Sequence, residues 1–197
     1  HSQCMESVYA HYPGLIVMTP ATVEDAYSML LEAIALDDPV IFCEHKLLYY
    51  HLKAERLPTE ALPAGKARIA RAGRDMTLVA YSAMVHEALA VAEELASEGT
   101  EVEVVDLRTV KPLDTDTVMA SVARTGRLLC VGESWPWGGV TAEVVARVAS
   151  EGFGLLDAPP QRLNAKYKPV PYHPNLWTVH RPTARSIAAA ARRLLRL

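Results

Sequence analysis

The sequence has no long hydrophobic run and no excess of charge of one sign. No apolar stretch reaches the roughly 18–20 residues that a membrane-spanning helix needs. The 197 residues carry a formal net charge of -3, so there is no general basic field to attract nucleic acid or anionic lipid. Hydrophobic residues make up 50% of the chain and charged residues 22%. This balance excludes intrinsic disorder and is typical of a globular protein with a buried core.

Cysteine is scarce as well. The three cysteines, Cys4, Cys43 and Cys130, lie far apart and are odd in number. Because no Cys-x-x-Cys pair occurs, we expect a reducing compartment, no disulfide framework and no structural zinc site. The first residue is His1 rather than Met, and no signal-peptide pattern follows it. We therefore expect the sequence to be a piece of a longer chain.

Common phosphate and nucleophile motifs are missing. No G-x-G-x-x-G, G-x-x-x-x-G-K-[ST] or G-x-S-x-G occurs, which argues against a dinucleotide site, a P-loop and a nucleophile elbow. None of the seven histidines forms an i, i+4 pair on an expected helix, so no metal geometry is indicated. Gly138 and Gly139 precede an expected helix and could present N–H groups to an anion. A tight turn is the favoured interpretation of this pair.

An α/β pattern begins near the N-terminus. Apolar residues 15–18 and 40–43 predict two buried strands, and residues 23–35 predict a helix between them. Thr22 is the expected N-cap, with Asp25 three residues later as an acidic variant of the capping box. Since two strands do not make a stable sheet alone, we expect missing chain or a partner to complete it. The expected buried face of the helix consists of Ala26, Leu30, Ala33 and Ile34.

A longer run of α/β units follows residues 51–65, which contain prolines and a glycine and read as a linker. Continuous apolar strands alternate there with helices of about 10–15 residues, which predicts a parallel sheet covered on both faces. Ser82 and Asp114 are candidate N-caps, and Gly99 is a candidate C′ residue. The expected strands are 67–70 at an edge, 76–81, 102–105 and 127–131, and the expected helices are 85–96, 114–123, 140–148 and 183–195.

Three acidic residues, Glu44, Asp106 and Glu133, directly follow expected strands. The carboxyl ends of parallel strands are where open α/β sheets bind ligands. Three such residues also occur by chance in an acidic chain, so a structural role is favoured for each.

Trp135 and Trp137 lie in a strand-to-helix loop and indicate an interface. Arginines on the last helix complement its dipole, and docking of an acidic partner is the weaker interpretation. These arginines are Arg185, Arg192, Arg193 and Arg196.

Several stretches also occur in a distinctive order. The most specific are HSQC at residues 1–4 and VDLRTVKPLD at residues 105–114. The others are HYPGL at 11–15, Pro20, EDA at 24–26, DPVIFCE at 38–44, GKA at 65–67, LDAP at 156–159 and VPY at 170–172. With these stretches, essentially the whole chain resembles the β subunit of the 2-oxo acid dehydrogenase E1 component, of the pyruvate or branched-chain type.

The resemblance implies an α/β fold made of two parts. A parallel-sheet, transketolase C-terminal-like domain would be preceded by an incomplete thiamine pyrimidine-binding α/β domain. Residues 1–50 would be the C-terminal remnant of the pyrimidine-binding domain, residues 51–65 a linker, and residues 66–197 the transketolase C-terminal-like domain. An incomplete first domain agrees with the two-strand argument above.

The resemblance also implies a thiamine diphosphate enzyme of α2β2 type. Its reaction would be oxidative decarboxylation of pyruvate or a branched-chain 2-oxo acid, with acyl transfer to lipoyl-E2. The α subunit would share the cofactor and hold Mg2+, because the activating glutamate would precede His1 and no GDG motif occurs here. We therefore expect the fragment alone to be inactive. The implied partners are the α subunit, a second β subunit, and the peripheral subunit-binding and lipoyl domains of E2, in the bacterial cytoplasm or the mitochondrial matrix.

Some single residues match functional positions of this family. His1 matches the active-site histidine, which would supply a proton to the departing thiolate of the lipoyl group. Asp157 and the terminal carboxylate of Leu197 match E2-docking positions of some members, although Asp157 also suits a turn before Pro159. The potassium-binding loop of the family corresponds to the backbone carbonyls of Ala33, Ile34, Leu36 and Asp38, where a plain helix stop is the alternative.

Two stretches, LNAKYK at residues 163–168 and WTVH at residues 177–180, depart from the family pattern. They leave the substrate subtype and E2 docking open, whereas ESWP at residues 133–136 resembles the pyruvate branch. Two alternatives therefore stand beside the main interpretation. The chain could be a non-catalytic dimerisation or E2-docking domain, or it could belong to acetoin dehydrogenase or another transketolase-like thiamine enzyme.

Overall fold

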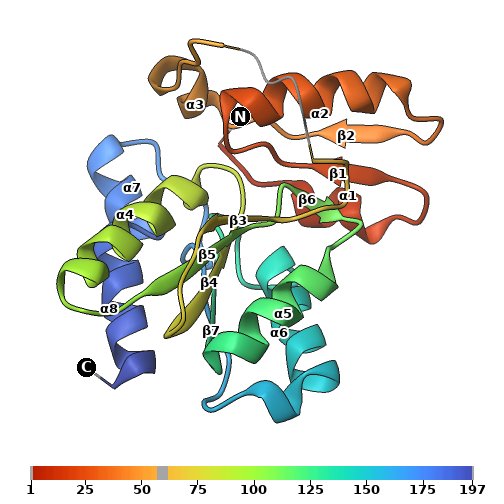
Figure 1. Cartoon of the computed structure of the whole chain (residues 1–197). Helices are drawn as coiled ribbons and strands as arrows, with labels where there is room; N and C mark the ends of the chain where they lie inside the picture. The colour runs from red at the N-terminus through yellow and green to blue at the C-terminus, as the bar shows by residue number, and fades with distance from the viewer. Residues whose placement is uncertain (1, 57–61, 197) are drawn as a thin grey trace.

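The structure is a computed structural model that describes residues 2–56 and 62–196 as two α/β units (Figure 1). In the first unit, β1 and β2 run parallel, with Val17 paired to Ile41. Thr22 caps the long helix as expected, because its hydroxyl accepts a hydrogen bond from the backbone N–H of Asp25 at 3.1 Å. The elements are α1 (Glu6–His11), β1 (Ile16–Met18), α2 (Val23–Ala35), β2 (Val40–Phe42) and α3 (Lys46–His51).

The second unit is a five-stranded sheet within the described residues, in the order β3-β5-β4-β7-β8. Strands β5, β4, β7 and β8 run parallel to one another, and β3 is an edge strand that pairs antiparallel with β5. The expected parallel sheet is therefore confirmed, with one antiparallel edge. The strands are β3 (Arg68–Arg71), β4 (Met76–Ala80), β5 (Val102–Asp106), β7 (Leu128–Val131) and β8 (Gln161–Leu163).

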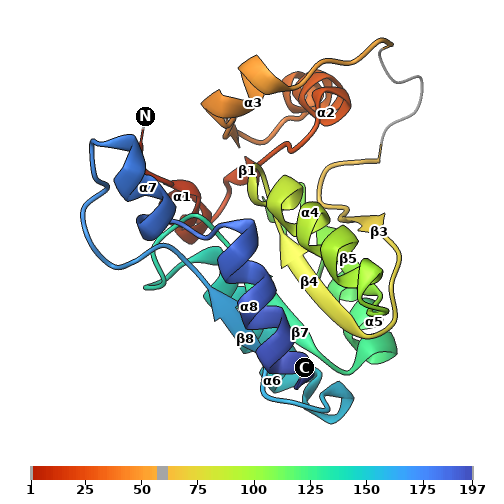
Figure 2. The ribbon, with the colours of Figure 1, turned by 90° about the vertical axis from the view of Figure 1, so that its left-hand side faces the viewer.

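Helices cover both faces of this sheet (Figure 2). Successive residues of β4 point to opposite faces, so Leu78 lies in one buried cluster with α4 and α8, and Val79 lies in the other with α5 and α6. Two separate cores therefore hold the sheet in place. The helices are α4 (Met84–Ser97), α5 (Thr115–Thr125), α6 (Val140–Glu151), α7 (Pro174–His180) and α8 (Ala184–Leu195), with a 3-10 turn, η1 (Phe153–Leu155). No helix of residues 2–56 and 62–196 is long and apolar enough to cross a membrane.

A strand of the second unit completes part of the first sheet. Strand β6 (Thr109–Lys111) pairs antiparallel with β1, and the described order is β2-β1-β6. Val17 faces Lys111, and the Lys111 ammonium also donates to the carbonyl oxygens of Ala10 and Tyr12 at 2.9 and 2.6 Å. The chain itself thus supplies a third strand at this edge, and the expectation that missing chain or a partner completes the first sheet stays a prediction for its other edge.

Two local expectations were also wrong. Leu30 and Ile34 of α2 are 44% and 75% exposed, whereas Asp25 and Met29 are buried. Asp25 lies on the buried face of the helix because it pairs with Arg68 and Arg108 of the second unit. Ser82 is not an N-cap: its φ is +51° and α4 begins at Met84, with no side-chain cap. The short elements α1, α3, β6, β8 and α7 have no clear periodic signal in the sequence.

Asp114 caps α5 and also holds the start of the second unit. Its carboxylate accepts from the backbone N–H and hydroxyl of Thr117 at 3.3 and 2.7 Å, and from the backbone N–H of Ala67 at 3.0 Å. Burial opposes its ionisation, yet these hydrogen bonds leave the pKa of Asp114 below its ordinary value. The cap is therefore a charged acceptor at a helix N-terminus, where the dipole favours it.

We expect Asp114→Ala to lower the free energy of unfolding by about 1–2 kcal/mol, the usual loss for an N-cap. The control is Asp116→Ala in the same helical turn, because Asp116 is exposed and its loss should stay within about 0.5 kcal/mol. Urea unfolding followed by circular dichroism measures both variants. Equal losses in the two variants would show that Asp114 is not a specific cap.

Candidate functional site

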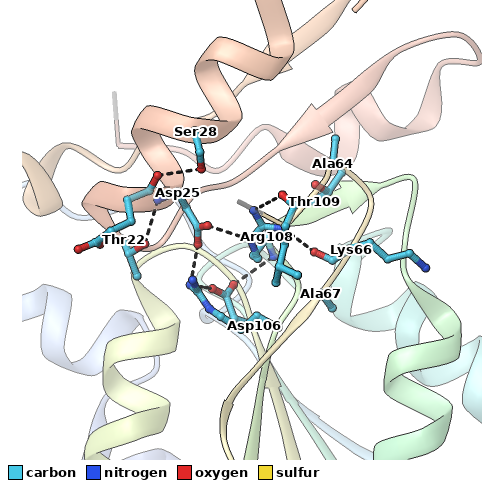
Figure 3. A network of polar contacts seen from close by, with 12 residues as sticks. Thr22, Asp25, Ser28, Ala64, Lys66, Ala67, Asp106, Arg108 and Thr109 are labelled. Atoms are coloured by element: carbon cyan, nitrogen blue, oxygen red, sulfur yellow. Dashed lines mark hydrogen bonds and ion pairs between the residues drawn. The ribbon is translucent and has the colours of Figure 1, made fainter. Parts of the chain in front are cut away.

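A buried arginine, Arg108, joins the two units (Figure 3). Its side chain has no exposed surface, and its Nε donates to Asp25 Oδ1 of α2 at 3.0 Å. The two terminal nitrogens donate to the backbone carbonyls of Leu62, Pro63 and Lys66, at 3.0, 3.3 and 2.7 Å. One guanidinium therefore holds the N-terminal turn of α2 and the segment that leads into the second sheet.

Arg68 extends this network to a second carboxylate, that of Asp106. Its Nη2 donates to Asp25 Oδ2 at 2.6 Å and to Asp106 Oδ2 at 2.9 Å, while the backbone N–H of Arg108 donates to Asp106 Oδ1 at 3.0 Å. Burial raises the pKa of Asp106 to about 6, although the Arg68 charge opposes the rise. Asp106 therefore has the structural role favoured from the sequence. We call Asp25, Arg68, Asp106 and Arg108 the interdomain network.

A second polar group gathers where β2, β4 and β7 end. His45 Nε2 lies 2.9 Å from Glu133 Oε2, and Arg181 Nη1 lies 3.6 Å from Glu133 Oε1. Arg181 also reaches Glu87 of α4 at 3.4 Å. Burial opposes ionisation of Glu133, but the His45 hydrogen bond and the Arg181 charge bring the pKa of Glu133 below its ordinary value. Glu133 is therefore an ionised carboxylate that links both units.

The ionisable groups around this carboxylate have raised pKa values. Burial raises the pKa of the Cys4 thiol and of the Tyr81 phenol, and raises the pKa of Cys43 to about 12. Burial, followed by the nearby Glu133 charge, also raises the pKa of Glu6. At neutral pH the thiols remain protonated, so neither is an activated nucleophile. We call Cys4, Glu6, Cys43, His45, Tyr81, Glu133 and Arg181 the strand-end cluster.

An apolar cavity of about 430 Å³ lies beside the start of the chain. Trp177 forms one wall, and its indole N–H donates to the carbonyl of Pro171 at 2.7 Å. The loop expected to form an interface contacts the segment before this cavity, because the Trp135 indole N–H donates to the carbonyl of Lys168. Trp137 is 78% exposed, and its interface role stays a prediction. The cavity is lined by Ser2, Val170, Pro171, Tyr172, Pro174 and Trp177.

The residues taken from the family resemblance fall into three groups. His1 and Leu197 lie outside the described residues. Asp157 is 68% exposed at its side chain, and its backbone N–H donates to the carbonyl of Gly126. The carbonyls expected to bind potassium lie at the end of α2, where the N–H of Leu36 donates to Glu32 and ends the helix. These residues are Ala33, Ile34, Leu36 and Asp38, and their potassium role stays a prediction.

The sequence analysis missed Glu6, His45, Arg108 and Arg181. Their partners lie far away in the chain: 88 residues separate His45 from Glu133, and 83 separate Arg108 from Asp25. The sequence placed Glu133 and Asp106 directly after strands, which correctly predicted that they lie at the carboxyl ends of the sheet. It gave no indication of which side chains they contact.

Two family models match the chain. Residues 1–51 match the transketolase pyrimidine-binding domain, and residues 65–187 match the transketolase C-terminal domain. The chain belongs to the transketolase C-terminal domain family. Among solved structures, a split-gene transketolase described as an inactive β4 tetramer superimposes with a TM-score of 0.82 and 22% identity, over 98% of this chain and 61% of that one. This likeness confirms the fold class expected from the sequence.

Curated relatives of this transketolase-family chain confirm the resemblance to E1 β subunits. The chain is 46% identical to the acetoin:2,6-dichlorophenolindophenol oxidoreductase subunit beta of Cupriavidus necator, over 100% of this chain and 58% of the relative. It is 45% identical to a mitochondrial pyruvate dehydrogenase E1 component subunit beta-2 of Oryza sativa, over 98% of this chain and 52% of the relative. The chain thus spans about half the length of the curated relatives it matches.

The transketolase family implies thiamine diphosphate. No three His, Cys, Asp or Glu side chains within residues 2–56 and 62–196 are placed to hold a metal ion. The cavity beside Ser2 has no charged side chain in its lining to pair with a diphosphate. The residues described above position the two units against each other, and the binding of the cofactor by this chain stays a prediction.

We expect Arg108→Met to lower the free energy of unfolding by about 3–5 kcal/mol, because it leaves buried Asp25 without its Arg108 partner. The matched control is Arg192→Met on α8, whose pairs with Glu94 and Glu98 are partly exposed. That control should lose much less, because solvent screens exposed ion pairs and they add little to stability. Urea titration measures both, and a loss at Arg108 no larger than that of the control would contradict the interdomain network.

Because the pKa of Asp106 is raised, its contribution to the free energy of unfolding should decrease as the pH rises. Because the pKa of Asp106 is about 6 in the folded protein and 3.8 ordinarily, the folded state binds this proton more tightly than the unfolded chain. Its contribution is fully present below about pH 4 and is lost as the pH rises through about 6. The unfolding free energy of the wild type minus that of Asp106→Asn should fall by about 3 kcal/mol between about pH 4 and 7. A difference that does not change with pH would contradict this prediction.

Proposed function

We propose that this chain is part of the β subunit of a thiamine diphosphate-dependent 2-oxo acid dehydrogenase E1. The reaction is oxidative decarboxylation of a 2-oxo acid with transfer of the acyl group to lipoyl-E2. The observation that carries the proposal is the 45% identity to a pyruvate dehydrogenase E1 β subunit over 197 residues, which runs through both matched domains. The HSQ stretch at residues 1–3, whose histidine is the proposed proton donor of acyl transfer, supports a catalytic role over that of a scaffold.

Acetoin is the second candidate substrate. The relative from Cupriavidus necator is named for acetoin and is 46% identical, as similar as the pyruvate dehydrogenase subunits. The two departing stretches of the sequence include Trp177, which lines the cavity beside Ser2. The apolar lining of that cavity suits a small uncharged group such as the alkyl part of either substrate.

The proposed assembly follows the same reasoning. The partners are an E1 α subunit, a second β subunit, and the peripheral subunit-binding and lipoyl domains of E2. The α subunit holds Mg2+ and shares the cofactor, and potassium binds the carbonyls at the end of α2. Asp157, whose side chain is exposed, and the terminal carboxylate of Leu197 are the proposed E2-docking positions. Relatives come from both mitochondria and bacteria, so the proposed compartment is the mitochondrial matrix or the bacterial cytoplasm.

The direct test is turnover of the full-length β subunit co-expressed with its α subunit. With thiamine diphosphate and Mg2+, we expect reduction of 2,6-dichlorophenolindophenol with pyruvate, 2-oxoisovalerate or acetoin, and no reduction when the cofactor is omitted. The 197-residue chain alone should give no turnover, since it spans only about half the length of the relatives it matches. An α-containing complex that binds E2 but turns over none of the three substrates would favour the non-catalytic alternative.

A further inference from the structure

The apolar cavity beside Ser2 lies where the two units meet. Ser2 belongs to the first unit, whereas the other lining residues belong to α7 and to the segment before it, in the second unit (Figure 2). The backbone N–H of Arg181 donates to the carbonyl of Trp177 at 2.9 Å, and the Arg181 guanidinium lies 3.6 Å from Glu133 at the end of β7. The cavity therefore adjoins the carboxyl ends of the parallel strands, where α/β proteins bind their ligands.

Hydrogen bonds fix the walls of this cavity. The indole N–H of Trp177 donates to the carbonyl of Pro171 at 2.7 Å and so ties α7 to the segment before it. His173 caps the start of α7, because its Nδ1 accepts from the backbone N–H of Asn175 at 3.2 Å. Since this bond uses the only polar group of the indole, Trp177 presents an apolar ring surface to the cavity. A cavity with fixed walls loses little conformational entropy when a ligand binds.

The size and the lining of the cavity indicate what fits it. Among the residues that the structure describes, no charged side chain lines the cavity, so it does not pair with the carboxylate of a 2-oxo acid or with a diphosphate. Its volume is about 430 Å³. A methyl group is close in size to a water molecule, whose share of the liquid volume is about 30 Å³. The methyl group of pyruvate or acetoin would thus leave most of the cavity empty, and a longer uncharged chain fits it better.

We propose that this cavity binds the lipoyl group and that Trp177 is a residue that determines specificity for it. The proposal rests on the proposed function, in which the acyl acceptor is a lipoyl group carried by E2. Lipoamide is a long uncharged hydrocarbon chain that ends in a ring with two sulfur atoms. Both methylene groups and sulfur pack favourably against aromatic rings. Trp177 is 40% exposed, so a tethered chain can reach the indole from solvent.

Saturation-transfer NMR with free lipoamide tests the binding directly, on the complex of the full-length β subunit with its α subunit. Trp177→Ala should raise the Kd of lipoamide about tenfold, because it removes the aromatic wall, whereas Trp177→Phe should keep most of the affinity. Val170→Phe should also raise the Kd, because the larger ring fills the cavity without removing a wall.

The matched control for binding is Phe153→Ala. Phe153 is an exposed aromatic residue on η1 that does not line the cavity, so its loss should leave the Kd of lipoamide unchanged. A wild-type Kd in both Trp177→Ala and Val170→Phe would overturn the proposal. So would a wild-type complex that does not bind lipoamide.

Turnover with two acceptors separates this proposal from the proposed function. The dye 2,6-dichlorophenolindophenol accepts electrons without a lipoyl group. In Trp177→Ala, the ratio of kcat/KM with lipoamide to kcat/KM with the dye should therefore fall about tenfold. An equal fall with both acceptors would show that Trp177 acts on a step that they share, and would overturn the proposal. If the wild-type complex turns over no substrate with either acceptor, the proposed function fails, and the Kd values still decide whether the cavity binds lipoamide.

Discussion

The structure depends on one buried guanidinium. Arg108 has no exposed surface and has protein partners for its Nε and both terminal nitrogens, which include Asp25 in the first unit and the carbonyl of Lys66 at the start of the second. Its own carbonyl accepts from the N–H and hydroxyl of Thr19 at 2.7 and 3.2 Å. A buried charge with incomplete partners is strongly destabilising, so the two units meet in the arrangement that satisfies Arg108.

This constraint organises the site as well. By fixing the N-terminal turn of α2 against the second sheet, the interdomain network aligns β1 with β6 and brings the end of β2 close to the end of β7. His45 and Glu133 consequently meet across the two units at 2.9 Å. The strand-end cluster is therefore a product of how the units join, and neither unit contains it alone. A pair of this kind is sensitive to small shifts between units, because a hydrogen bond weakens steeply with distance and angle.

The sequence predicted the elements whose signal is local. The strands near 76–80 and 128–131 are continuous apolar runs, and Thr22, Asp114 and Gly99 occupy the cap or turn positions expected of them. The strands of three residues, such as β6 and β8, are too short to show a period. The buried face of α2 was predicted wrongly. Apolar residues at helical spacing, such as Leu30 and Ile34, indicate a helix, but they do not show whether another part of the same chain packs on that face. The site residues were only partly predictable: Glu133 and Asp106 were marked by their place after strands, but their partners come from distant segments.

The second unit contributes strand β6 to the sheet of the first unit, and this pairing has an evolutionary consequence. A domain that folds from contiguous sequence can be shuffled into a new gene as a cassette. Here a recombination breakpoint between the two matched domains would separate β1 from its neighbour at Lys111 and leave an unpaired edge on the remaining piece. The two units must therefore be inherited together, and a descendant that splits this gene at that point would need to keep both products in one complex.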